Sequence, residues 1–206
     1  MRALRSLPLA FAALACLTSA ASAQAPERHM GVQLRALAGP AVLHAFQDAG
    51  GGQTNTITGV ATAFNFVLGS MVSDNLAVNL DLVLSRAGNA DHGVLEDTTF
   101  AAVHFGAGVT YWIMPANVFL AGSLGAARSS VEGTPIRIDI EIPDIDPSRV
   151  GVGVHLSAGK LWWIARRWGL GASLSLLAST ASNPDGGIDT ERNVLGAAVA
   201  LSATFH

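Results

Sequence analysis

The stretch that decides the fold is LAVNLDLVLS, residues 76–85, in which strongly apolar residues occupy every second position. In an extended strand the even-numbered residues share one face, and the odd-numbered residues share the other, which carries Asn79 and Asp81. FAAVHFGAGVTYW, residues 100–112, repeats the alternation, and its second face is again small or polar. Because that second face holds so few charges, we expect the apolar face to contact lipid rather than the core of a soluble sandwich.

The composition is that of a membrane protein without a membrane-spanning helix. Half of the 206 residues are hydrophobic and 13% are charged. After the N-terminal segment, however, no run reaches the roughly 18 consecutive apolar residues that a spanning helix needs. Backbone polar groups in lipid must be hydrogen-bonded within the protein, which leaves a closed β-barrel. The formal net charge of −3 and the lack of a basic stripe predict no nucleic-acid partner.

Residues 1–23 have the pattern of a secretory signal peptide. Two arginines precede a short apolar segment, and Ala21-Ser22-Ala23 forms a small-residue cleavage site. We expect cleavage before Gln24 and a barrel domain over residues 24–206. The only cysteine, Cys16, would leave with the signal peptide, so we predict neither a disulfide nor a cysteine metal site, and no other metal site or cofactor.

The alternation continues along the chain and predicts eight strands joined by connections of alternating length. The connections after the second, fourth and sixth strands are about five residues long. The others run from about 12 to 20 residues and are rich in Gly, Pro, Asn and Asp. We therefore predict an all-β fold, an eight-stranded antiparallel up-and-down transmembrane β-barrel with short periplasmic turns and longer extracellular loops. The predicted strands cover residues 30–38, 56–69, 75–86, 98–112, 117–129, 149–162, 168–179 and 192–205.

The large amphipathic aromatic residues lie next to the predicted periplasmic turns. Three of the four tryptophans fall within GKLWWIARRWGLGASLSL, residues 159–176, and the fourth follows the single tyrosine at the end of the fourth strand. Such rings prefer the headgroup level of a membrane. We predict that they form an aromatic girdle, made of Tyr111, Trp112, Trp162, Trp163 and Trp168.

Four segments, YWIMPANVFLAGSLG, GVGVHLSAGKLWW, WGLGASLSLL and the terminal LGAAVALSATFH, resemble the small outer-membrane β-barrels of Gram-negative bacteria, the OmpA/OmpX-like eight-stranded barrel family. The resemblance covers the mature chain and implies residence in the bacterial outer membrane. It also implies an assembly signal in the last strand for the outer-membrane assembly machinery, formed by Val199, Leu201, Ala203 and Phe205. His206 departs from the family, which usually ends on the aromatic residue. The resemblance specifies architecture rather than activity, because the family includes adhesins, structural anchors, small channels and lipid-modifying enzymes.

Four polar residues are predicted to face the barrel interior near the middle of their strands: Arg35, Asp81, His104 and His155. Eight strands leave an interior that side chains fill, which argues against a wide aqueous pore. We favour a structural network with Arg35 paired to Asp81, because a buried charge without a partner is costly. The alternative is a polar gate or a proton-sensitive plug. The pairing predicts that removing Asp81 alone destabilises more than removing both residues.

An enzymatic interpretation rests on His155-Leu156-Ser157, which resembles the His-x-Ser of outer-membrane lipid A deacylases. In such a pair the histidine would activate the serine for attack on an ester. Ala158 stands where that family has Asn, and both residues are predicted to face the interior rather than the lipid. We therefore predict no catalytic residues.

The predicted outer loops carry most of the acidic residues, which keep loops solvated and can also contact lipopolysaccharide through bridging cations. In the loop at residues 130–148 four isoleucines, Ile136, Ile138, Ile140 and Ile142, alternate with charged residues. This pattern favours a hairpin of the fifth and sixth strands that projects from the membrane and binds an extracellular partner. Our leading hypothesis is a non-enzymatic barrel with a filled lumen, acting in envelope integrity or surface interaction among outer-membrane lipids and lipopolysaccharide. A narrow channel for small or hydrophobic solutes is the alternative, and a lipid A-modifying enzyme ranks third.

Overall fold

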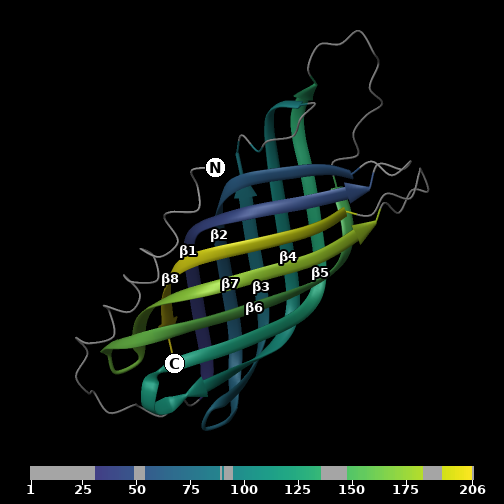
Figure 1. Ribbon diagram of the computed structural model, residues 1–206. Helices are drawn as coiled ribbons and strands as arrows, with labels where there is room; N and C mark the ends of the chain where they lie inside the picture. Colours follow the sequence, from purple (N-terminus) through teal and green to yellow (C-terminus); the bar gives the residue numbers. More distant parts are fainter. Residues whose placement is uncertain are drawn as a thin grey trace.

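The computed structural model describes residues 31–48, 54–88, 90, 95–135, 148–182 and 192–205. Eight antiparallel strands form one closed barrel, whose arrangement can be followed in Figure 1. No helix in this described part of the chain is long and apolar enough to cross a membrane. The predicted signal peptide at residues 1–23 lies outside the described residues. The strands are β1 Val32–Asp48, β2 Thr54–Ser73, β3 Leu76–Ala87, β4 Leu95–Ile113, β5 Val118–Pro135, β6 Ser148–Ala165, β7 Trp168–Ser182 and β8 Arg192–Phe205, with the short 3-10 helix η2 Met114–Ala116 between β4 and β5.

The predicted topology is confirmed, because every strand pairs with its sequence neighbour and β8 pairs with β1. The pairing is staggered around the barrel. Cross-strand partners followed from Arg35 on β1 through Asp81 on β3 return to β1 at Ala45, ten residues further along the strand. A stagger of this kind tilts the strands against the barrel axis. On a neighbouring strand, the residue at the same membrane level is therefore just over one position away from the hydrogen-bonded partner.

The first strand is much longer than predicted. It continues through Gly39 and Pro40 to Asp48, and only residues 49–53 separate it from β2, so the predicted long first loop is wrong. Proline lacks the amide N–H that a sheet ladder needs. The β1–β8 ladder omits Gly39 and Pro40, while both remain paired to β2. A side chain at Gly39 would overlap the backbone of Val199, so β8 passes close to β1 here.

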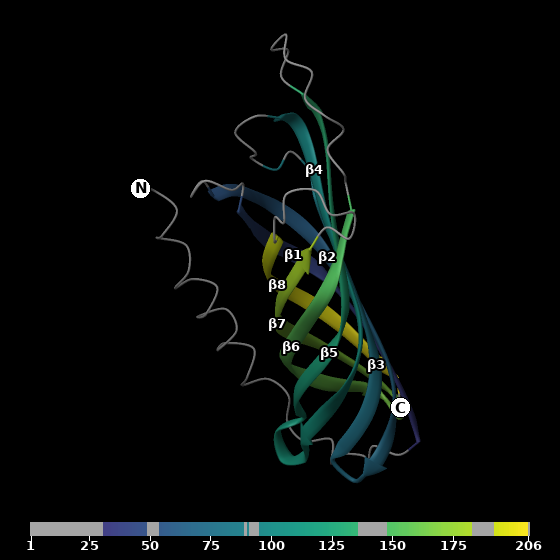
Figure 2. The same ribbon diagram turned by 90° about the vertical axis from the view of Figure 1, so that its right-hand side faces the viewer.

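The short turns lie at the barrel end that also holds the start of β1 and the end of β8 (Figures 1 and 2). Residues 74–75 join β2 to β3, and residues 166–167 join β6 to β7. The turn between β4 and β5 is closed by Asn117, which adopts a left-handed conformation with φ 51° and donates its amide to the carbonyl of Met114 at 3.1 Å. This end is the periplasmic end of the predicted topology.

At the opposite end, β4 and β5 reach furthest from the short turns (Figure 2). Their ladder extends to the Leu95–Pro135 pair, whereas the described part of the β5–β6 ladder ends at the Ser130–Ser148 pair. The described projection is therefore a β4–β5 ribbon, and the predicted hairpin of β5 and β6 stays a prediction. The isoleucine-rich segment at residues 136–147 lies outside the described residues.

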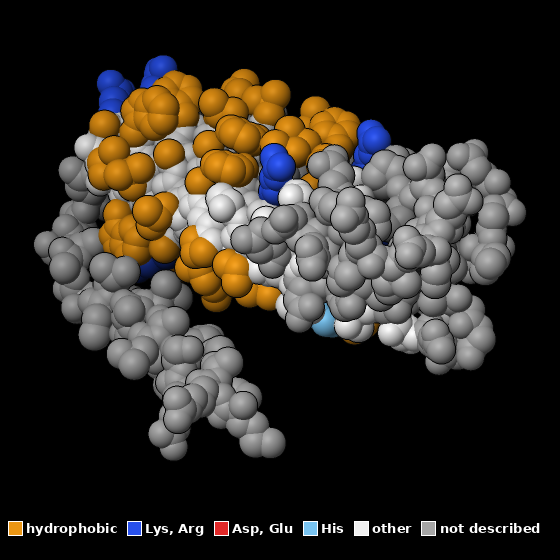
Figure 3. Space-filling model, turned by 90° about the horizontal axis from the view of Figure 1, so that it is seen from above, with side chains coloured by type: hydrophobic (Ala, Val, Ile, Leu, Met, Phe, Trp, Pro, Cys, Tyr) orange, Lys and Arg blue, Asp and Glu red, His pale blue; other side chains and the backbone are white. Residues whose placement is uncertain are grey.

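The outer surface of the barrel carries a broad band of apolar side chains, with separate Lys and Arg side chains among them (Figure 3). The predicted alternation is confirmed in β3, where Val78 and Leu80 are exposed while Asn79 and Asp81 are buried. An apolar outer face on a closed barrel satisfies the backbone internally and is matched to lipid.

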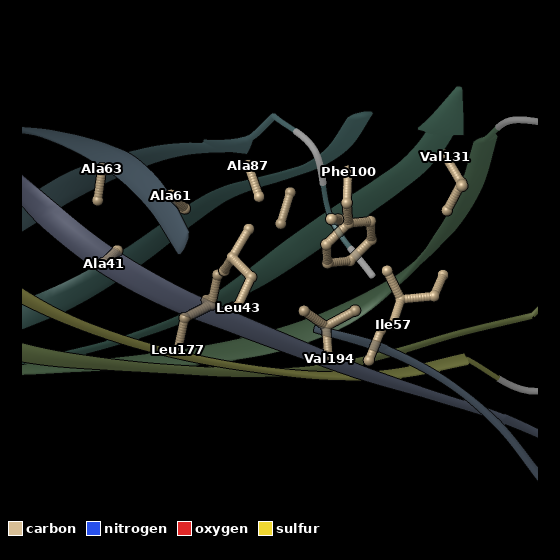
Figure 4. Packing of buried hydrophobic residues seen from close by; sticks show 13 residues of the cluster. Ala41, Leu43, Ile57, Ala61, Ala63, Ala87, Phe100, Val131, Leu177 and Val194 are labelled. Carbon is tan, nitrogen blue, oxygen red and sulfur yellow. The ribbon is translucent and has the colours of Figure 1, made fainter. Parts of the chain in front are cut away.

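The interior is filled by two apolar clusters. The larger cluster lies nearer the extracellular end, and Figure 4 shows its side chains converging from strands around the barrel, with Leu43, Ile57 and Phe100 among them. The smaller cluster lies nearer the periplasmic end and comprises Leu37, Trp112, Phe119, Leu161 and Ala200. We call these the extracellular cluster and the periplasmic cluster. Along β4 and β5, polar residues separate the two.

Candidate functional site

The polar residues between the two clusters are organised around Asp81 of β3. Its Oδ2 accepts a hydrogen bond from Ser123 Oγ at 2.6 Å and another from His155 Nδ1 at 2.7 Å. Its Oδ1 accepts a hydrogen bond from Asn65 Nδ2. All four side chains are buried and come from β2, β3, β5 and β6. Asp81 therefore ties together strands on opposite sides of the interior, which no backbone ladder does.

His104 of β4 joins this group through Ser123. Its Nε2 lies 3.0 Å from Ser123 Oγ, and its ring centroid is 6.3 Å from that of His155. The hydroxyl of Ser123 has one proton, which it donates to Asp81, so the Ser123 oxygen accepts from His104 Nε2. We call Asn65, Asp81, His104, Ser123 and His155 the polar cluster.

The polar cluster does not have the geometry of an activated nucleophile. A general base would have to accept the Ser123 proton, but that proton is committed to Asp81. Ser123 is 5% exposed and lies inside the barrel wall. The predicted alternative pair, His155 and Ser157, also faces the interior, and His155 Nδ1 is committed to Asp81. Among the described residues, no group of three potential metal ligands is close enough to hold a metal ion.

Arg35 lies in the same interior but outside the polar cluster. The side chain is 0% exposed, and its guanidinium carbon stacks 3.9 Å from the centre of the Phe119 ring. None of its three guanidinium nitrogens has a hydrogen-bond partner among the described residues. The predicted direct pairing of Arg35 with Asp81 is therefore absent, because the carboxylate takes its hydrogen bonds from Asn65, Ser123 and His155.

The structure thus places all four predicted interior residues, Arg35, Asp81, His104 and His155, on the buried face, and it brings the last three together. Asn65 and Ser123 are functional members of the cluster that the sequence analysis missed. A signal for both was present, since each is a polar residue on the inward face of an alternating strand at mid-length.

The predicted aromatic girdle needs two corrections, at Trp112 and at Trp163. Tyr111 and Trp168 are exposed on the outer face near the periplasmic turns, and Trp162 is half-buried there. Trp112 is 1% exposed and packs inside the periplasmic cluster, 5.5 Å from Phe119 between ring centres. Successive strand residues face opposite sides, so Tyr111 and Trp112 cannot both point outward. Trp163 follows Trp162 in the same strand, so it lies on the opposite face from Trp162. Its indole nitrogen donates a hydrogen bond to Asn117 Oδ1 at 3.4 Å.

The predicted assembly residues lie on the outer face of β8. Val199 and Leu201 are exposed, whereas Ala203 and Phe205 are partly covered. The ring of Phe205 lies 5.3 Å from that of Trp168, across the β7–β8 pair. The last strand therefore presents one continuous apolar face to the membrane.

A closed barrel with an apolar outer belt and aromatic residues at one rim spans a membrane. The fold is that of a small outer-membrane barrel. No protein-family model matches the chain, and no match was found among curated proteins.

Solved structures with a similar chain path include three outer-membrane proteins. Ail, the attachment invasion locus protein of Yersinia pestis, is 16% identical, with 84% of this chain and 99% of that chain covered and a TM-score of 0.44. Neisserial surface protein A is 16% identical, with 85% and 96% covered and a TM-score of 0.48. OprG from Pseudomonas aeruginosa is 12% identical, with 87% and 98% covered and a TM-score of 0.46. These likenesses concern the fold alone.

Proposed function

We propose that this protein is a non-enzymatic outer-membrane barrel with a sealed interior, which acts in envelope integrity or surface interaction through its extracellular loops. The observation that carries the proposal is the filling of the interior. Along β4, Phe100 of the extracellular cluster, His104 of the polar cluster and Trp112 of the periplasmic cluster follow one another, and each is at most 1% exposed. A solute would have to displace all three layers.

The chemistry of the interior supports a structural role. The Asp81 carboxylate receives three side-chain hydrogen bonds, and the polar cluster that supplies them joins five strands. Hydrogen-bonded buried networks of this kind rigidify a core. A rigid, filled barrel leaves the loops as the part of the protein that can vary its contacts. An extracellular partner bound through residues 130–148, and recognition of β8 by the assembly machinery, belong to this proposal.

Single-channel recording tests the sealed interior. Refolded protein, shown to be folded by its heat-dependent mobility on electrophoresis, is added to a planar lipid bilayer, with a general porin in the same bilayer as the positive control. We expect no discrete openings from the barrel. Reproducible openings would overturn the proposal and favour the alternative of a narrow channel.

Loop deletion tests the division between barrel and loops. Removing residues 134–146 takes away the end of β5 and the segment that follows it, and leaves the three interior layers in place. We expect the variant to fold and to protect expressing cells from sodium dodecyl sulfate as well as the full chain does, if the barrel itself serves envelope integrity. Loss of folding would show that the segment is structural and would contradict a role confined to surface contacts.

A further inference from the structure

Two arginines stand out on the lipid-facing surface. Arg86 of β3 and Arg128 of β5 are exposed on the outer face, in the extracellular half of their strands. Neither has an ion pair among the described residues. The acidic residues whose side chains the structure describes are Asp74 in a periplasmic turn and Asp81 in the interior, so neither can neutralise these arginines.

The stagger of the barrel brings the two arginines to one membrane level. Following hydrogen-bonded partners, Arg86 pairs with Ala101 and Ala101 pairs with Ser130. Each hydrogen-bonded partner lies slightly closer to the extracellular end than the residue it pairs with on the preceding strand, and the total shift is ten residues over eight strands. From β3 to β5 the shift is therefore two to three residues. The residue of β5 level with Arg86 therefore lies two to three positions before Ser130. Arg128 is the outward-facing residue at that position, about 12 Å from Arg86 between backbones, from two strand spacings and an offset of two residues.

An apolar groove lies beside Arg128 on the same outer surface. It has a volume of about 300 Å³ and crosses β5 to β8. Its outward-facing lining includes Leu124, Val152, Val154, Ala178 and Leu195. Leu124 is the second outward position below Arg128 on β5. From Leu124 the partners Val154, Ala178 and Leu195 follow the rising stagger, so the groove runs obliquely from the level of Arg128 at β8 to a deeper level at β5.

We propose that Arg86, Arg128 and this groove form a seat for a phosphorylated glycolipid of the outer leaflet, the lipid A part of lipopolysaccharide. The phosphate lies between the two guanidinium groups, and an acyl chain lies in the groove. Guanidinium groups bind phosphate oxygens through paired hydrogen bonds, and the contact is strong where lipid excludes water. The inference deepens the proposed envelope role, and it does not depend on whether the loops bind a partner.

The position of the seat specifies the occupant. The arginines lie at the barrel end opposite the short turns and the chain ends, which is the extracellular end. A headgroup bound there belongs to the outer leaflet. Two cations at one level match a phosphate of the sugar headgroup of a glycolipid, and the apolar groove beside them favours an anion that also carries acyl chains.

Native mass spectrometry of the full folded chain in detergent, titrated with diphosphoryl lipid A, tests the seat. Arg86→Gln and Arg128→Gln each remove one charge-assisted contact, so each should weaken binding about tenfold, and together by about a hundredfold. The matched control is Arg166→Gln with Arg167→Gln, which removes the same charge at a periplasmic turn and should leave the affinity within about twofold. Ala178→Phe fills part of the groove and should weaken lipid A binding while both arginines remain.

Three results would overturn the proposal. The first is unchanged lipid A affinity in the folded Arg86→Gln and Arg128→Gln single variants. The second is equal binding of phosphatidylglycerol and diphosphoryl lipid A to the unmodified chain, which would indicate a general attraction of anionic lipids. The third is an equal loss in the periplasmic control. Channel openings in the bilayer experiment would contradict the proposal of a sealed interior but would not affect the proposal of a lipid seat, so the two failures are distinguishable.

Discussion

Asp81 and Arg35 are buried charges in two regions of the barrel interior, and the two regions differ in the hydrogen bonds that they offer to the charge. Asp81 and Arg35 occupy matching register positions on β3 and β1, with Val67 of β2 between them. Around Asp81, three side chains donate hydrogen bonds to the carboxylate. Around Arg35, the guanidinium has no hydrogen-bond partner among the described residues and lies on the face of Phe119.

The difference shows that burial alone does not make a charge structurally important. A buried ion stabilises a fold when its hydrogen-bonding groups are satisfied, and it is a cost when they are not. The polar cluster around Asp81 is thus the part of the interior that holds the strands together. The region around Arg35 stays closed through the apolar packing of the periplasmic cluster.

The largest expected effect is that of Asp81→Ala. The change leaves Asn65, Ser123 and His155 as buried donors without their acceptor, and should lower the free energy of unfolding by about 3–5 kcal/mol. Urea unfolding of the refolded barrel in lipid vesicles, followed by tryptophan fluorescence, measures the loss. A decrease below about 1 kcal/mol would mean that these donors find other acceptors.

The opposite sign is expected for Arg35→Met. Methionine keeps an unbranched side chain against Phe119 and removes the buried charge, so the free energy of unfolding should stay equal or rise, by up to about 4 kcal/mol. The same urea titration measures the change. A clear destabilisation would show that the guanidinium makes a contact as favourable as those of Asp81, and the contrast between the two regions would fail.

Double-mutant cycles separate the partners of Asp81. Asp81→Ala combined with His155→Ala should give a coupling energy of about 1–3 kcal/mol, because the side chains are hydrogen-bonded. Asp81→Ala combined with Arg35→Met should give a smaller coupling energy, because the two opposite charges attract each other without a hydrogen bond between them. A larger coupling to Arg35 than to His155 would restore the pairing that the sequence suggested.

The smallest expected change in the free energy of unfolding comes from removing a buried hydroxyl, and one such hydroxyl lies in each region. Ser123→Ala removes a hydrogen bond to Asp81 and should cost about 1 kcal/mol. Thr204 pairs with Arg35 in the β1–β8 register, and its hydroxyl has no partner among the described residues. Thr204→Val should therefore leave the free energy of unfolding unchanged or slightly increased. Equal losses from both variants would remove the distinction between the regions.

The sequence predicted the architecture because a barrel wall imposes one strong rule, the alternation of lipid-facing and interior residues. LAVNLDLVLS shows this rule over its whole length, and it placed Asp81 correctly inside. The rule also determines Trp112, which follows the outward Tyr111 and must turn inward. Proximity to a turn was the wrong criterion for that residue.

Two other features could not be obtained from the alternation. Gly39 and Pro40 have the composition of a loop, and only the pairing with β2 shows that the strand continues through them. The partners of Asp81 depend on the stagger around the barrel. Asp81 lies opposite Gly106 rather than His104, so the contact to His104 passes through Ser123 from a third strand.

The interruption at Gly39 and Pro40 affects how the first and last parts of the chain are held together. The contact of β1 with β8 consists of two separate ladders, Leu34–Ala38 with Leu201–Phe205 and Ala41–Gln47 with Arg192–Ala198. Among the eight strand contacts, this one joins the residues furthest apart in sequence, and loop closure makes such contacts the last to form. The cylinder is therefore completed by two short stretches of backbone hydrogen bonds that can form one after the other.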